Sequence, residues 1–437
     1  MENPPLPQAF VASVSDQLGA AAEPFLATYA DPPAHGLRVN PARTTLDELR
    51  ARTGWDLEPI PWCPDGAYVD PAVRAGAHPF HAAGLYYLQE PTAMAVAEFA
   101  DLAPAMTVLD LAAAPGGKST AIASAIGPAG LLVANEIHPA RIKPLGENLE
   151  RWGVTNTVIT NRTPESLAAL GPVFERVVVD APCSGEGLFR RDPDARREWS
   201  PERVRGSADR QLEILRAALP LVAPGGALVY STCTFNTTEN EEVVERILAE
   251  FPAFRLAATM RLWPHEVRGE GHAMTRLVHT GEPASEWVGF APAPSYRGDA
   301  WSRFVADTLT ADPVERWGGR VIEREGRLTL QPVHPLVESI GRTVRAGLWL
   351  GDIKPGRFEP SHALALALDP ADARNRLDLT IPEARAWIAG ETVQSPGPAG
   401  WLLVTVEGHP LGWGKRTGAT VKNHYPKGLR RAVRREA

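Results

Sequence analysis

Between residues 84 and about 250, short apolar runs alternate with stretches in which apolar residues recur every three or four positions. The short runs predict buried strands and the longer stretches predict helices. Such alternation is typical of a parallel sheet with helices on both faces. The predicted strands are 107–112, 131–137, 177–182 and 227–233, and the predicted helices are 117–127, 140–153 and 237–251. In the last helix, Thr238 and Glu241 have the spacing of a capping box.

The segments on either side have other patterns. Residues 6–29 have helical spacing, residues 37–41 predict a strand, and Thr45 is the expected N-cap of the next helix. These elements predict a small α/β module that ends near residue 75. Around 261–310 the periodicity weakens while Pro and Gly increase, which predicts a linker. Beyond it, VIEREGRLTLQP predicts a hairpin, and GWLLVTVEGHPLGWGKRT predicts two strands around EGHP.

Composition narrows the class of protein. The 437 residues are too many for one core, with 44% hydrophobic and 22% charged residues as in ordinary globular proteins. The three cysteines lack paired spacing and cannot form a disulfide framework, which favours a reducing compartment. The N-terminus does not match a signal peptide, and no apolar run approaches the roughly 18 residues of a membrane span. We expect a cytoplasmic monomer without membrane or metal partners.

The charge is unevenly distributed. The formal net charge of −7 argues against a protein that coats nucleic acid indiscriminately. However, Arg190, Arg191, Arg196 and Arg197 form one basic cluster, and residues 415–437 carry eight basic residues against one acid. A charge run is often only a solvated face. Together, the two clusters predict a local footprint for phosphate groups.

The loop AAAPGGKS at 112–119 joins a predicted strand to a predicted helix. Its backbone N–H groups therefore face an anionic ligand group at a helix N-terminus. A nucleotide P-loop would match at Gly117, Lys118 and Ser119, and the strand VVVD imitates the acidic strand of such an ATPase. Against this interpretation, Ala112 replaces the first glycine of the pattern, and Pro115 removes a donor.

Two other ligands suit the same topology. A nicotinamide cofactor is disfavoured because the loop lacks G-x-G-x-x-G. S-adenosylmethionine is favoured, because Gly116 and Gly117 permit close backbone approach. Asp110 ends the first strand, and Glu136 ends the next, where an acid can accept both ribose hydroxyls. Each acid alone could be an ordinary loop residue, but both lie in register with the loop.

Two of the three cysteines end predicted strands, namely Cys183 in DAPCSGEG and Cys233 in YSTCTF. Open α/β sheets bind ligands at this edge. A single such cysteine is more often a buried small hydrophobe, but a pair beside a cofactor loop indicates cytosine chemistry. A thiolate that adds to C6 makes C5 nucleophilic, and after methyl transfer the C5 proton and the thiolate leave. The spacing does not rank the two cysteines, and Cys63 in PWCPDG lacks such a setting.

These motifs, with ENE after the second cysteine, resemble those of the Sun-family RNA (cytosine-5)-methyltransferases. The RxNP stretch at 38–41 and YYLQEPTAM at 86–94 match the family's lead-in. The domain order is similar to the bacterial small-subunit rRNA methyltransferase F type. The resemblance implies a doubly wound, Rossmann-like class I S-adenosylmethionine-dependent methyltransferase core, a small N-terminal α/β module and β-rich C-terminal modules. The expected domains are an RNA-binding module at 1–75, the methyltransferase at 76–285, a small α/β linker module at 300–370 and a PUA-like RNA-binding module at 378–437.

The resemblance also implies roles for matched residues. Cys233 would attack C6, and Cys183 would assist proton removal and release. Asp180 would contact the cofactor and the amino edge of cytosine, and Lys118 would lie near the target base. The expected cofactor-binding residues are Ala112, Ala113, Ala114, Pro115, Gly116, Gly117, Lys118, Glu136, Arg141, Thr163 and Asp180. One departure is that Arg162 or Thr163 stands where a further cofactor-binding acid is expected.

The implied function is S-adenosylmethionine-dependent methylation of cytosine C5 in 16S ribosomal RNA, with ribosomal RNA or the small subunit as partner. Transfer RNA is the alternative substrate within the class. A P-loop ATPase and a non-catalytic rRNA-binding assembly factor are alternatives from other classes, and the second needs neither cysteine. The basic clusters would hold phosphates around an unstacked cytosine. Trp387, Trp401 and Trp413 could stack on bases, but we expect core packing for at least two of them.

Overall fold

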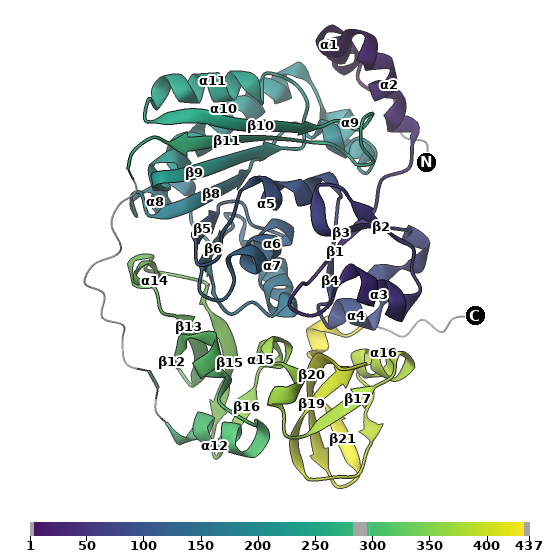
Figure 1. The fold of residues 1–437 in the computed structure, drawn as a ribbon, viewed down its shortest axis with the longest axis vertical. Coiled ribbons are helices and arrows are strands. Elements are labelled where there is room, and N and C mark those ends of the chain that lie inside the picture. The colour runs from purple at the N-terminus through teal and green to yellow at the C-terminus, as the bar shows by residue number, and fades with distance from the viewer. Residues whose placement is uncertain (1–3, 283–294, 297, 432–437) are drawn as a thin grey trace.

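A computed structural model describes residues 4–282, 295–296 and 298–431. Its centre is an eight-stranded sheet with the order β10-β11-β9-β8-β5-β6-β7-β14 (Figure 1). The strands are β5 (Thr107–Asp110), β6 (Leu131–Asn135), β7 (Thr157–Thr160), β8 (Phe174–Asp180), β9 (Val222–Thr232), β10 (Phe254–Leu262), β11 (His272–His279) and β14 (Arg345–Ala346). The five strands from β5 to β9 pair in parallel, so their carboxyl ends share one edge.

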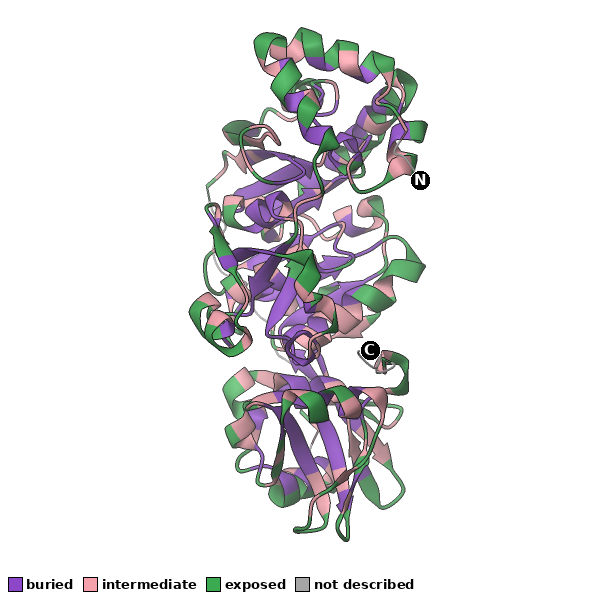
Figure 2. Cartoon of the chain, turned by 90° about the vertical axis from the view of Figure 1, so that its right-hand side faces the viewer, coloured by how far each residue is buried: buried purple, intermediate pink, exposed green. Residues whose placement is uncertain are grey.

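Helices cover both faces of this sheet, which confirms the doubly wound α/β prediction. One face packs against α5 (Ala95–Phe99), α6 (Gly117–Ile126) and α7 (Pro139–Trp152), and the other against α8 (Pro164–Ala168), α10 (Pro201–Ala218) and α11 (Glu241–Glu250). Successive strand residues alternate between the two cores, with Val108 in one and Leu109 in the other. Both faces are apolar, so the strands are continuous hydrophobic runs in the sequence. Figure 2 shows buried residues concentrated in the strands.

The N-terminal part begins with α1 (Gln8–Leu18) and α2 (Ala22–Ala27) and continues into a four-stranded sheet. Its order is β2-β3-β1-β4, with β1 (Gly36–Val39), β2 (Leu57–Ile60), β3 (Cys63–Val69) and β4 (Tyr86–Gln89). Thr45 caps α3 (Leu46–Thr53) in a capping box with Glu48, as the sequence predicts. Because β4 pairs with β1, this sheet extends past residue 75 and across α4 (Pro79–Ala82).

Two residues of the RxNP stretch connect this sheet to the central one. The Arg38 guanidinium donates to the Gly117 carbonyl (3.1 Å) and to the Thr120 hydroxyl (2.7 Å) in the first turn of α6. It also lies over the Trp152 ring at the end of α7. The Asn40 amide donates to the carbonyls of Gly84 and Trp152. The N-terminal part therefore fixes the two helices that flank the glycine-rich loop.

The predicted capping box at Thr238 and Glu241 is wrong. Helix α11 begins at Glu241 after Asn240, and no side chain caps it. The Thr238 hydroxyl instead donates to the Glu242 carboxylate (3.1 Å). Asn240 is buried and donates to the Asn236 carbonyl (2.7 Å), so tertiary contacts set the start of the helix.

The linker predicted at 261–310 is also wrong where this stretch is described. Strand β11 lies between β9 and β10 and is antiparallel to both, and α12 (Asp299–Thr308) is a helix. The alternation is weak in β11 (His272–His279) because this strand lies inside the sheet and is buried over most of its length. Residues 283–294 and 297 lie outside the described residues.

Two smaller sheets form the C-terminal part (Figure 1). The first contains β12 (Gly319–Arg324), β13 (Arg327–Pro332), β15 (Leu348–Lys354) and β16 (Arg357–Pro360), in that order. The second has the order β17-β19-β20-β21-β18, with β17 (Arg376–Leu379), β18 (Val393–Gln394), β19 (Gly400–Val406), β20 (His409–Thr417) and β21 (Thr420–Asn423). Short helices accompany them, namely α13 (Pro313–Trp317), α14 (Pro335–Ser339), α15 (His362–Ala367) and α16 (Ile381–Ala389). The predicted β12–β13 and β19–β20 hairpins are confirmed, as is core packing of Trp387 and Trp413, whereas Trp401 is half-buried.

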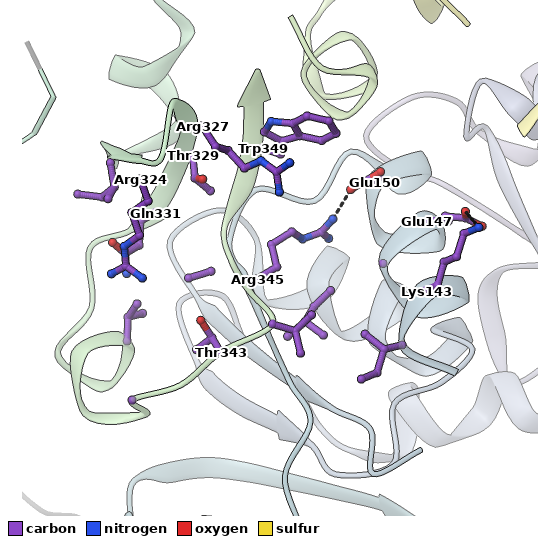
Figure 3. A pocket seen from close by; sticks show the side chains of 18 of the residues that line it. Lys143, Glu147, Glu150, Arg324, Arg327, Thr329, Gln331, Thr343, Arg345 and Trp349 are labelled. Atoms are coloured by element: carbon purple, nitrogen blue, oxygen red, sulfur yellow. Dashed lines mark hydrogen bonds and ion pairs between the residues drawn. The ribbon is translucent and has the colours of Figure 1, made fainter. Parts of the chain in front are cut away.

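The C-terminal part is joined to the central sheet through β14, which pairs antiparallel with β7. A cleft of about 740 Å³ lies here between α7 and strands β12, β13 and β15 (Figure 3). Arg345 of β14 forms an ion pair with Glu150 of α7, drawn as a dashed line in Figure 3. Lys143 and Glu147 pair on the same helix. The facing charges of this cleft thus largely satisfy one another.

The arginines at 190–197 do not form the predicted phosphate footprint. The Arg190 side chain is only 7% exposed and pairs with buried Glu270 at 2.7 Å. Arg191 reaches the same carboxylate at 3.4 Å, and Arg196 donates to three backbone carbonyls. Arg197 alone is well exposed, and it pairs with a neighbouring acid. The cluster therefore stabilises the fold, because its partners lie elsewhere in the chain.

We expect Arg190→Met to lower the free energy of unfolding by about 3 kcal/mol, because it leaves the Glu270 carboxylate buried without its closest cation. Urea denaturation measures this change. Arg197→Met is the control and should change stability by less than about 0.5 kcal/mol. Equal stability of the two variants would contradict the assignment of Arg190 to the core.

Candidate active site

The carboxyl ends of β5, β6, β8 and β9 bring the predicted residues to one edge of the central sheet. The loop 111–116 follows β5, Glu136 follows β6, Asp180 ends β8, and Cys233 follows β9. Parallel pairing of adjacent strands causes this convergence, since each strand enters the edge in the same direction. Residues that are far apart in the sequence thereby become neighbours.

The glycine-rich loop is held from the side of α7. Arg141 donates to the Ala114 carbonyl (2.5 Å), and Asn148 donates to the Pro115 carbonyl (2.7 Å). Gly116 is the N-cap of α6 with φ of 111°, a conformation that side chains with a Cβ rarely adopt. These contacts direct loop carbonyls toward α7 and leave the start of α6 available for a ligand.

Two buried carboxylates at this edge each have one oxygen without a hydrogen-bond partner. Glu136 Oε1 accepts from the His138 backbone N–H (2.8 Å), whereas Oε2 has only the Arg141 guanidinium at 3.4 Å. Asp110 Oδ2 accepts from the Ser119 hydroxyl (2.6 Å), whereas Oδ1 has no partner. Burial raises the pKa of Asp110 to about 6, although the Ser119 hydrogen bond opposes it. Unsatisfied buried acceptors are costly, and donors such as ribose hydroxyls and an amino group would satisfy them.

The positions of Arg162 and Thr163 do not supply a further acid. The Thr163 hydroxyl accepts from the Ser166 backbone N–H and caps α8. The Arg162 guanidinium donates to the carbonyl of Ile340 (2.8 Å), a residue that precedes β14, the strand paired with β7. Both side chains therefore have local structural partners.

Asp180 and Lys118 form an ion pair, with Lys118 Nζ donating to Asp180 Oδ2 at 2.6 Å. The other oxygen accepts from the Ser231 hydroxyl (2.9 Å), and His272 Nε2 lies 3.4 Å from it. Burial alone would raise the pKa of Asp180, but Lys118 and His272 outweigh it and hold that pKa well below its usual value. For Lys118, burial lowers the pKa, and the charge of Asp180 more than compensates. The pair is therefore ionised at neutral pH.

The two strand-end cysteines face one another as free thiols. Their Sγ atoms lie 3.1 Å apart, and both residues are half-buried. The hydrogen bond with Cys233, followed by burial, raises the pKa of Cys183 well above its usual value. Cys63 lies in the N-terminal sheet, where burial raises its pKa to about 11. The adjacent sulfurs of Cys183 and Cys233 suit chemistry in which a flat ring lies against one of them.

A buried polar network holds the two cysteine loops together. Asn236 Nδ2 donates to both Glu186 (2.9 Å) and Glu239 (2.8 Å). The Ser184 backbone N–H donates to Glu239, and the Glu186 carboxylate accepts from the backbone N–H of Phe235. Each carboxylate thus connects the loop after Cys183 to the loop after Cys233.

Sequence reasoning missed several of these contributors. Glu186 and Glu239 stand inside the motifs DAPCSGEG and ENE, and Ser231 precedes the second cysteine, so the motifs themselves contained the signal. His272 had none, because β11 lies in the stretch predicted as a linker. Its role depends on tertiary pairing with β9.

Among the described residues, no helix is long and apolar enough to cross a membrane. The same residues contain no group of three or more His, Cys, Asp or Glu side chains placed to hold a metal ion.

Comparison with known proteins gives the family. Models described as "N-terminal domain of 16S rRNA methyltransferase RsmF", "16S rRNA methyltransferase RsmB/F", "RsmF rRNA methyltransferase first C-terminal domain" and "Methyltransferase RsmF PUA domain" match residues 6–91, 99–281, 303–368 and 374–431. The chain is 33% identical to ribosomal RNA small subunit methyltransferase F of Cronobacter sakazakii, over 97% of this chain and 96% of that protein. This chain belongs to the small subunit methyltransferase F family. The Serratia proteamaculans relative of the same name is 34% identical over the same shares.

Solved structures support the fold. A methyltransferase homologue from Pyrococcus horikoshii is 24% identical with a TM-score of 0.56, covering 62% of this chain and 95% of that one. NSun6 from Pyrococcus horikoshii, solved with SFG, is 19% identical with the same TM-score, covering 63% and 99%. The family match makes the chain a methyltransferase, and these structures support the class I fold of its core. The P-loop ATPase and nicotinamide interpretations are thereby removed.

The raised pKa of Asp110 predicts a pH-dependent stability. A buried carboxyl with a folded-state pKa near 6 favours the folded state below about pH 4, and this contribution is lost as the pH rises through 6. We therefore expect Asp110→Asn to be more stable than the wild type at pH 7.5, by up to about 3 kcal/mol. The advantage should disappear at pH 4. Urea denaturation at both pH values measures it, and a pH-independent difference would contradict the assignment.

Proposed function

We propose that this chain uses S-adenosylmethionine to methylate C5 of a cytosine in 16S ribosomal RNA, through a covalent bond between Cys233 and C6. The observation that carries the proposal is the 3.1 Å contact between the Cys183 and Cys233 sulfurs, beside the Lys118–Asp180 pair. The relatives called ribosomal RNA small subunit methyltransferase F support the substrate class. We expect the protein to act in the cytoplasm on ribosomal RNA or the small subunit.

The cofactor site follows from the unsatisfied acceptors. Glu136 Oε2 would accept from the ribose hydroxyls, and the N-terminus of α6 at Gly116 and Gly117 would face the amino-acid end of the ligand. S-adenosylmethionine supplies an electrophilic methyl group. Arg141 supports this site indirectly, because its guanidinium holds the Ala114 carbonyl and the Glu136 carboxylate in place.

The reaction uses the two sulfurs in sequence. The Cys233 thiolate forms a bond to C6, and the electron pair of the C5=C6 bond makes C5 nucleophilic toward the methyl group. Loss of the C5 proton to a water molecule returns that pair, the S–C6 bond breaks, and the thiolate is regenerated. Cys183 assists proton removal and release. Asp180 accepts from the cytosine amino group while Lys118 compensates its charge.

Fewer basic residues near the C-terminus are free to contact RNA than the sequence predicts. Lys422 and Lys427 are exposed, whereas Arg416 is buried against backbone carbonyls. Arg430 and Arg431 donate to the carbonyls of Tyr425 and Gly76. Residues 432–437, with Arg434 and Arg435, lie outside the described residues.

Glu136→Gln tests the cofactor site. The amide offers one acceptor fewer and places donors where the ribose hydroxyls also donate, so S-adenosylmethionine affinity should fall at least about tenfold, as for a lost charged hydrogen bond. Isothermal titration calorimetry measures it. Glu147→Gln, at the cleft between α7 and strands β12, β13 and β15, is the control and should bind normally. Unchanged affinity in both variants would remove Glu136 from the site.

The two cysteines should fail differently when replaced by alanine. Cys233→Ala cannot add to the ring, so it should give neither 5-methylcytosine nor a covalent RNA complex. Cys183→Ala can still add and methylate, but slow proton loss should let the adduct persist. A denaturing gel with labelled RNA should show a retarded band for Cys183→Ala alone.

The opposite gel pattern would make Cys183 the nucleophile. Full activity of both variants would show that neither cysteine takes part in the reaction and would overturn the covalent mechanism. Mapping 5-methylcytosine in naked 16S RNA and in assembled small subunits after incubation with the wild type identifies the substrate, and transfer RNA is included as the competing substrate.

A further inference from the structure

The Glu239 carboxylate lies fully buried behind the cysteine pair. Three groups donate to it, namely the Ser184 backbone N–H (2.9 Å), Gln211 Nε2 (2.9 Å) and Asn236 Nδ2 (2.8 Å). All three are donors, so the carboxyl group acts only as an acceptor, which matches its ionised form. Burial raises its pKa, while the hydrogen bonds from Ser184 and Asn236 oppose this. Among the described residues, no cationic side chain lies within ion-pair distance of it.

This negative charge is held against the backbone next to Cys183. Its donor Ser184 directly follows Cys183, and the strongest electrostatic effects on the Cys183 thiol come from Cys233 and Glu239, both of which disfavour its ionisation. Tyr230 also lies near both Cys183 and Glu239, but its pKa is raised far above neutrality by burial. On the other side, the Lys118 ammonium interacts with Cys233. The pair thus has an anion behind Cys183 and a cation facing Cys233.

We propose that Glu239 is a positioning residue that decides which sulfur is the nucleophile, by keeping Cys183 in the thiol form so that Cys233 carries the negative charge. The 3.1 Å contact then has a direction, with Cys183 donating its S–H to Cys233. The use of this asymmetry in cytosine methylation rests on the proposed function. The asymmetry itself is a property of the free protein.

Glu186 provides a matched comparison. It is also buried, it also binds the Asn236 amide, and its carboxylate receives donors only, from Asn236, Phe235 and the Trp199 indole. However, its effect on the Cys183 thiol is smaller than that of Glu239. A structural defect should appear in variants of either glutamate, whereas loss of the charge asymmetry should appear only for Glu239.

The test is the pH dependence of alkylation by iodoacetamide, followed separately for each cysteine by peptide mass spectrometry. It uses the full chain without RNA or cofactor. Glu239→Gln should make Cys183 react at least about tenfold faster at pH 7.5, with its pH midpoint shifted down by a unit or more. Glu186→Gln should leave the Cys183 profile unchanged, and Glu239→Asp, which keeps the charge, should restore it in part. Thermal unfolding of each variant separates this effect from loss of the fold.

An unchanged Cys183 profile in folded Glu239→Gln would overturn the inference, as would equal shifts in the two glutamine variants. The outcome is independent of the gel assay for the covalent complex. If that assay makes Cys183 the nucleophile while Glu239→Gln still shifts its profile, the proposed mechanism fails and the charge asymmetry stands. If the gel assay succeeds and the profile does not move, only the role of Glu239 fails.

Discussion

The active-site edge depends on how the charge of the partly buried Asp180 is compensated. Three elements converge on this carboxylate, with Lys118 from α6, Ser231 from β9 and His272 from β11. A partly buried carboxylate without a cation would be costly, so α6 has to start where its Lys118 can reach β8. That start is the glycine-rich loop, and Ser231 stands two residues before Cys233. Compensation of one charge therefore sets the spacing between the cofactor loop and the cysteine strands.

The central sheet could be predicted from the sequence because its physics is local and periodic. Runs such as the one ending at Asp180 are apolar on both faces, and the rule that parallel strands present their carboxyl ends together brings Cys183 and Cys233 to one edge. The loop at 112–119 could be recognised because it follows a strand and its glycines permit close approach of a ligand to the backbone. The N-cap at Thr45 could also be predicted, because its capping box involves only the four consecutive residues from Thr45 to Glu48.

The rest depends on partners that a linear pattern does not contain. Arg190 looks like a surface charge until Glu270 is placed beside it, 80 residues later in the chain. Thr238 has the spacing of a cap, but burial of Asn240 decides where α11 begins. Strands β10 and β11 lack alternation for different reasons, because β10 is mostly exposed at the sheet edge and β11 is buried over most of its length. Deciding which sulfur is the nucleophile likewise requires the positions of the buried Glu186 and Glu239. The motifs contain both residues, but the sequence does not show where their carboxylates lie.

The pairing of β14 with β7 has a consequence for biosynthesis. Residues 345–346 occupy the edge of the central sheet, yet they leave the ribosome long after β7 at 157–160. At a synthesis rate of about 20 residues per second, roughly ten seconds separate the two segments. During that interval the nascent core has an open β7 edge, which can pair with other chains. Completion of the sheet thus waits for the C-terminal half, and a nascent chain interrupted before residue 345 would carry an aggregation-prone edge.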